Sequence, residues 1–160
     1  MVSNLLLTPS KVPMQMNTLP AARTYVIEEP FDRALKLVRH ALEIQELSIA
    51  GEFDVTKDIV TDDSFERLEP SRLLLVDSPL LLFEALALDR AAGVFVPVHV
   101  LVSADGDSTQ VVCVEPASLF EARLPVGASQ PLADLRRRVT MALESLVPQS
   151  VPHRSRRDHL

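Results

Sequence analysis

Apolar side chains recur along this chain at two spacings, and these spacings divide it into predicted helices and strands. A period of about 3.6 residues, typical of a helix with one buried face, runs through residues 30–46. The same period recurs from the turn Asp77-Ser78-Pro79 to Gly93, and from Pro131 to Pro148. Proline after a polar residue favours a helix start, because its missing N–H has no partner there. The sequence therefore predicts three amphipathic helices.

Five other segments are apolar in alternation or throughout, which is typical of strands. They are residues 23–28, 48–55, 72–76, 94–102 and 109–115. Within 48–55, alternation places Ile49, Gly51, Phe53 and Val55 on one face.

The segments between the strands predict how they connect. The last two strands flank Asp105-Gly106, a pair that favours a hairpin, while residues 56–70 and 117–130 are expected to be loops, the first with a possible short helical turn. The order is β-α-β-β-α-β-β-α. It predicts an α+β fold with a mostly antiparallel sheet of about five strands and helices packed on it.

The chain of 160 residues fits a single domain with two tails. Residues 1–20 contain three prolines and no lasting apolar period, so we expect a flexible arm. Residues 148–160 hold two prolines and three arginines, and we expect a disordered basic tail. Residues 21–147 are the predicted domain.

Charge and composition exclude several partners. The net charge is −6, there is no tryptophan, and Tyr25 is the one tyrosine. An acidic body does not suit a phosphate backbone, and few aromatic side chains are available to stack on bases, so no nucleic-acid partner is expected. No apolar run approaches the ~18 residues of a membrane span, and the first residues lack a signal-peptide pattern. We expect a cytoplasmic protein with no membrane partner.

Residues 50–117 carry an ordered series of features. Glu52-Phe53-Asp54 is followed by a strand, the Asp77-Ser78-Pro79 turn and a leucine-rich helix. Next come Gly93, the strand with Val96-Pro97-Val98, an Asp-Gly hairpin and a strand ending at Glu115-Pro116. This series resembles the family called domain of unknown function 302.

The resemblance implies a single-copy version of the TATA-box-binding-protein-like fold, a shape that implies no DNA binding. It implies no activity either, because none is settled for the family. Members often carry cysteine at the positions held here by Asp77 and Val98, so thiol chemistry at those positions is absent from this chain.

The strand 94–102 would present an apolar side chain on both faces. Val94, Val96, Val98, Val100 and Val102 alternate with Phe95, Pro97, His99 and Leu101. Because an antiparallel sheet with one wet face should alternate with polar residues, the second face is expected to be covered. A ligand, a second subunit or the chain's own segments could cover it. Phe95, Pro97, His99, Leu101 and Asp77 are the candidate ligand-binding residues.

His99 is the candidate general base, with Glu115 or Asp54 to orient it. The alternative is a partly buried histidine whose polar atoms are satisfied structurally, with the acids forming a solvated rim. One cysteine, four histidines and no HExxH spacing predict no tightly bound transition metal. The four glycines never cluster, so no phosphate-binding loop and no cofactor are expected.

Three functions remain open from the sequence. The first is a small accessory protein that binds a small apolar molecule or a protein partner through its sheet. The second is an acid/base enzyme that acts on a small apolar substrate with His99 as base. The third is a structural homodimer module. A concave pocket around His99 would favour the enzyme, whereas a flat apolar face on a two-fold axis would favour the dimer.

Overall fold

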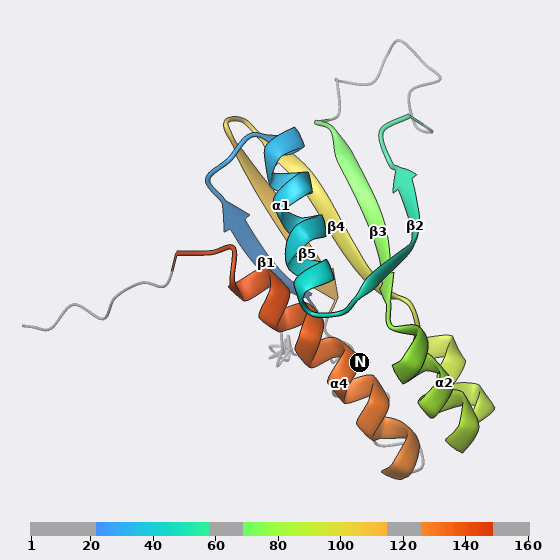
Figure 1. Ribbon diagram of the computed structural model, residues 1–160. Helices are drawn as coiled ribbons and strands as arrows, with labels where there is room; N and C mark the ends of the chain where they lie inside the picture. Colours follow the sequence, from blue (N-terminus) through green and yellow to red (C-terminus); the bar gives the residue numbers. More distant parts are fainter. Residues whose placement is uncertain (1–21, 58–68, 115–125, 149–160) are drawn as a thin grey trace, which may run out of the picture.

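Five strands form one sheet in the order β1-β5-β4-β3-β2 (Figure 1). The computed structural model describes residues 22–57, 69–114 and 126–148. The strands are β1 (Ala22–Ile27), β2 (Ser48–Asp54), β3 (Ser71–Asp77), β4 (Val98–Asp105) and β5 (Ser108–Val114). Every neighbouring pair is antiparallel. The predicted α+β class and the predicted order of elements are confirmed.

The helices lie on one face of the sheet and beyond one of its ends. They are α1 (Phe31–Ile44), α2 (Pro79–Leu88), the 3-10 helix η1 (Arg90–Phe95) and α4 (Val126–Glu144). Figure 1 shows α1 and α4 across one face, while α2 extends past the end where β3 finishes. The main core lies between this face and the two long helices. It includes Val38 and Leu42 of α1, Val139 of α4, and Leu74, Val100 and Val102 of the sheet.

Helix α1 ends in a Schellman motif. The Leu47 N–H donates to the Leu42 carbonyl at 3.1 Å, and the Glu46 N–H donates to the Glu43 carbonyl at 2.9 Å. Leu47 and Leu42 are both buried, which adds the apolar contact typical of this ending. Glu46 takes a φ of 58°, the left-handed conformation that the motif requires.

The predicted strand 94–102 begins later than expected. Strand β4 starts at Val98, and helix α2 ends at Leu88 rather than at Gly93. The intervening residues form η1, which begins where the Asp89 carboxylate accepts a hydrogen bond from the Ala91 N–H at 2.9 Å. Helix η1 turns Phe95 toward a small cluster made with α2 and α4. Tertiary packing therefore overrides the apolar alternation of residues 94–97.

The third predicted helix starts earlier than expected. It begins at Val126 rather than Pro131, so the end of the predicted loop 117–130 is helical. Ala128 is fully buried in the small cluster with Ala85, Ala92 and Leu132, and this packing holds the first turn of α4 in place. Pro131 therefore lies inside the helix, where it cannot donate to the Gly127 carbonyl.

Several predictions fall on residues that the structure does not describe. The arm 1–20, Glu115 and, apart from Pro148, the tail 148–160 lie outside the described residues. Within the described ranges, no helix combines the length and apolar character that a membrane span requires. The cytoplasmic location stays a prediction.

Candidate functional site

The two faces of the sheet differ in what covers them. Side chains of alternate residues on β3, β4 and β5 point under α1 and α4, and Leu74, Val76, Val100, Val102 and Val111 are all fully buried there. Their sequence neighbours point to the opposite face, because side chains alternate along a strand. In the described part of the chain no helix lies on that second face, which we call the open face (Figure 1).

An apolar row crosses the open face. The strand register places Phe53 of β2 opposite Leu73 of β3, Leu73 opposite Leu101 of β4, and Leu101 opposite Val112 of β5. Directly opposed residues share a face, so these four side chains form one continuous row. Thr24 of β1 ends the row opposite Val112. Phe53 is 53% exposed, and the other three apolar side chains are partly exposed.

Polar side chains border the apolar row on one side. Ser71 of β3 lies opposite Ser103 of β4, and the Ser71 hydroxyl donates to the Ser103 hydroxyl at 2.9 Å. Gln110 of β5 lies opposite Ser103, and its amide nitrogen donates to the Asp105 carboxylate at 2.7 Å. An apolar centre with a polar border is the composition of a protein interface.

His99 borders the row on its other side, and Asp77 lies one side chain further along the same face. His99 is exposed and lies opposite Leu75 on the open face. Asp77 lies two residues after Leu75 on the same strand, so it shares this face. The Ser48 hydroxyl donates to its Oδ1 at 2.6 Å. Of the predicted site residues, the structure brings His99, Leu101 and Asp77 to one face.

Phe95 and Pro97 do not belong to that row. Phe95 lies in η1 and packs against the small cluster of α2 and α4 beyond the end of the sheet. Pro97 precedes the first residue of β4. The expected apolar set of the hairpin is therefore split, because its first half is not a strand.

Asp54 lies on the helix-covered face, opposite to His99. It pairs in the register with Arg72, which alternates with the buried Leu74 and Val76. Arg72 Nη1 contacts Asp54 Oδ2 at 2.6 Å. The sheet therefore separates Asp54 from the His99 imidazole, and the structure does not bring these two residues together.

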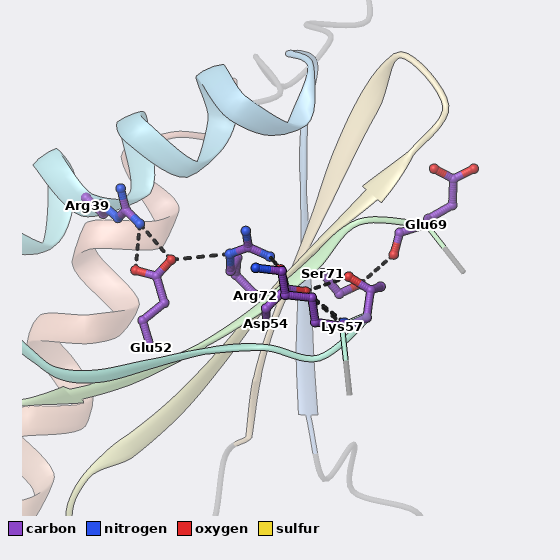
Figure 2. A network of polar contacts seen from close by, with 8 residues as sticks. Arg39, Glu52, Asp54, Lys57, Glu69, Ser71 and Arg72 are labelled. Atoms are coloured by element: carbon purple, nitrogen blue, oxygen red, sulfur yellow. Dashed lines mark hydrogen bonds and ion pairs between the residues drawn. The ribbon is translucent and has the colours of Figure 1, made fainter. Parts of the chain in front are cut away.

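The charges around Asp54 form a chain of ion pairs at the edge of the helical layer (Figure 2). Arg72 Nε lies 3.4 Å from Glu52 Oε1, and Arg39 of α1 bonds both oxygens of Glu52 at 2.6 and 2.7 Å. Two guanidinium groups thus neutralise two carboxylates. The network joins α1 to the edge of the sheet, which is a structural role.

Local hydrogen bonds hold the pKa of Asp54 below its ordinary value. The Thr56 hydroxyl donates to Oδ1 at 2.6 Å and is the largest cause of the lowering, while the lesser desolvation of the carboxyl acts in the opposite direction. The N–H groups of Lys57 and Thr56 also donate, and the Arg72 charge adds to them. A carboxylate with a lowered pKa is a weaker proton acceptor, so this environment does not favour a general base.

Phe53, Leu73 and Val112 are residues of the open face that the sequence analysis did not single out. The predicted alternation placed Phe53 with Ile49, but the register shifts between Ile49 and Gly51. This irregularity sends Ile49 to the core, opposite Val76, and Phe53 to the open face. Leu73 lay in a continuously apolar strand whose pattern does not separate the two faces. Only the pairing of four strands assembles the row.

No trio of His, Cys, Asp or Glu side chains suited to a metal ion occurs among the described residues. The arrangement is that of an α+β protein with one helix-covered face and one open, partly apolar face.

Comparison with known proteins gives the family. The model of the family "Domain of unknown function DUF302" matches residues 23–146, and the chain belongs to this family. The chain is also similar in structure to an uncharacterized conserved DUF302 protein from Bacillus stearothermophilus, with a TM-score of 0.68 and 16% sequence identity. That match covers 79% of this chain and 98% of the other, and it shows a shared fold. No curated protein matches this chain.

Proposed function

We propose that this chain is a non-catalytic binding protein that takes a protein partner on the open face of its sheet. The observation that carries the proposal is the row Phe53, Leu73, Leu101 and Val112, which none of the described helices covers. Leaving apolar area in water costs about 25 cal/mol per Å². An exposed apolar row with a polar border supports an interaction site on this face.

The breadth of the face favours a protein over a small molecule. Five strands spaced by about 4.8 Å span roughly 19 Å, measured across their axes. Small-molecule sites are concave and enclose most of the ligand, whereas protein interfaces are broad with an apolar centre and a polar border. The hydrogen-bonded Ser71, Ser103, Gln110 and Asp105 on one side of the row fit such a border.

His99 fits this function as a polar contact rather than as a base. An imidazole that acts as general base is usually oriented by a carboxylate. Asp54 is on the opposite face, Glu115 lies outside the described residues, and Asp77, which shares the face, makes its hydrogen bond with Ser48 and none with His99 among the described residues. The acid/base alternative therefore has less support than the binding function.

The test compares Leu101→Lys with Ile44→Lys, which places the same charge at an exposed apolar site on α1 away from the open face. Each purified variant is immobilised and exposed to an extract of the source cells. We expect one protein to be retained by the wild type and by Ile44→Lys but lost from Leu101→Lys, with direct binding of that purified protein weakened about tenfold or more.

Equal retention of the partner by the immobilised wild type, Leu101→Lys and Ile44→Lys would contradict the proposal. A small molecule retained in native mass spectra of the wild type and lost from Leu101→Lys would assign the face to a ligand. Light scattering that shows Leu101→Lys alone as monomer would assign it to a second copy.

A further inference from the structure

Helix α2 is apolar around most of its circumference, with Glu84 as its one charged residue, although only part of it is buried. Leu81 and Ala85 pack inward toward α4. Five large apolar side chains of this region are exposed, and we call them the outer α2 surface: Leu80, Phe83, Leu86 and Leu88 of α2, and Val94 of η1. A helix that is hydrophobic all round is normally buried. Here Leu80 is 63% exposed, Phe83 70% and Val94 83%.

Two residues of the outer α2 surface also contact the neighbouring helices. Leu86 packs so closely over Gly93 that a Cβ at this position would come within 2.9 Å of the Leu86 Cδ2. Leu88 lies at an ordinary contact distance from Gly127, near the start of α4. These contacts tie α2 to η1 and to α4. Because α2 extends past the end of the sheet, the described part of the sheet does not obstruct an approaching protein (Figure 1).

The size of the surface matches what a stable dimer needs. The exposed fractions, applied to the roughly 150–250 Å² of an aromatic side chain as an upper bound for leucine and valine, give at most about 470–780 Å² of apolar area. A standard interface buries about 800 Å² on each partner, of which about 60% is apolar. The outer α2 surface therefore supplies the apolar part of one half of such an interface.

Its charges fit a second copy of the same chain. Glu84 of α2 and Arg90 of η1 are exposed, and neither has an ion-pair partner among the described residues. In an interface with two-fold symmetry, a residue i that contacts j on the partner implies that j contacts i. Glu84 of each copy can then face Arg90 of the other. Because each chain supplies one acid and one base, the dimer contains two intermolecular ion pairs.

We propose that α2 and η1 form the interface of a two-fold symmetric homodimer, in which the outer α2 surfaces of two copies pack against each other. This surface is separate from the open face of the sheet, which stays free for another partner. The dimer would thus present two open faces.

Light scattering on the full chain, from micromolar to submillimolar concentration, tests the proposal. We expect a wild-type mass of about 35 kDa, twice the 17.7 kDa of the chain. Phe83→Glu and Leu80→Glu should each weaken dimerisation about tenfold or more and show the monomer mass at low concentration. Ile44→Glu is the matched control, because Ile44 is 64% exposed but lies on α1, and it should keep the wild-type mass.

Exchange of the two charges tests the symmetry. Glu84→Arg and Arg90→Glu should each weaken the dimer, and the double variant should restore it. Circular dichroism verifies that each variant is folded. Because Phe83→Glu and Leu80→Glu are tested separately, the experiment remains informative if one of them does not fold. A monomeric wild type would overturn the proposal and assign the surface to another protein or to the chain's own segments. A dimer that persists in both apolar variants, or that only Leu101→Lys dissociates, would also overturn it.

Discussion

At the scale of single residues, the sheet gives identical side chains opposite surroundings. Leu73 and Leu74 are neighbours on β3, yet Leu74 is fully buried under the helices and Leu73 lies in the partly exposed apolar row. Nothing in the sequence of this strand separates them, because it is apolar on both faces. The distinction arises from the pairing of β3 with its neighbours and from the helices on one face.

The energetic difference between the two leucines can be measured. Leu74→Ala should lower the free energy of unfolding by about 2–5 kcal/mol, because it removes buried methyl groups and leaves a cavity. Leu73→Ala should cost about half of that or less, since water can fill the space that it leaves. Urea unfolding of both variants provides the measurement. Equal losses would mean that the second face is as fully covered as the first.

The carboxylate of Asp54 should respond to its threonine neighbour. Thr56→Val removes the hydroxyl that donates to Oδ1, so the pKa of Asp54 should rise toward its ordinary value of 3.8. A carbon-detected NMR titration of the carboxyl group measures this change directly. Thr24→Val, on the open face at the far edge of the sheet, is the matched control and should leave the pKa of Asp54 unaltered.

The same substitution predicts a change in how stability depends on pH. Because the pKa of Asp54 is lower in the folded chain, its charge stabilises the fold above the ordinary pKa of 3.8. That stabilisation is lost as the pH falls through the folded pKa. Wild type and Thr56→Val differ in their free energies of unfolding, and the part of this difference that comes from the charge of Asp54 should be present at neutral pH. It should shrink as the pH falls into the acid range. If this part instead grew in acid, the lowered pKa of Asp54 would be contradicted.

At the scale of elements, local patterns predicted which segments exist, and tertiary contacts decided where two of them begin. The apolar period of residues 30–46 was sufficient to predict α1, and the Asp-Gly pair was sufficient to predict the hairpin of β4 and β5. The turn of η1 was missed because residues 94–97 alternate like a strand. The packing of Phe95 against α2 and α4 instead places Val94 and Phe95 in η1. The start of α4 was missed because proline favours a first helical turn. The open row was missed because it requires four strands in register.

The ending of α1 offers a further test at this scale. Glu46 holds a φ of 58°, which costs a residue with a Cβ about 1–2 kcal/mol and glycine almost nothing. Glu46→Gly should therefore raise the free energy of unfolding by about 0.5–1 kcal/mol, although it removes the 3.1 Å contact with Arg138. Glu46→Ala loses the same contact without relieving the backbone, so it should not stabilise. Urea unfolding separates the two effects.

At the scale of the whole molecule, we predict that residues 21–147 carry the stability of the chain. The family match spans residues 23–146, and the sequence outside 21–147 is interrupted by prolines and shows no apolar period. A chain reduced to 21–147 should keep its melting temperature within about 5 °C, which corresponds to about 1 kcal/mol. Calorimetry measures this value. A loss of cooperative melting would show that a removed segment covers apolar surface.

The order β1-β5-β4-β3-β2 also bears on the order in which the strands can pair during synthesis. Strands β2, β3, β4 and β5 lie side by side in the order in which the ribosome makes them, so each new strand can pair with the one before it. Strand β1 is made first, but its pairing partner is β5, with Ala22 opposite Val114. Closing such a distant pair is slow, because the chain must lose the most entropy for it. We therefore expect β1, the first strand made, to be the last to join the sheet.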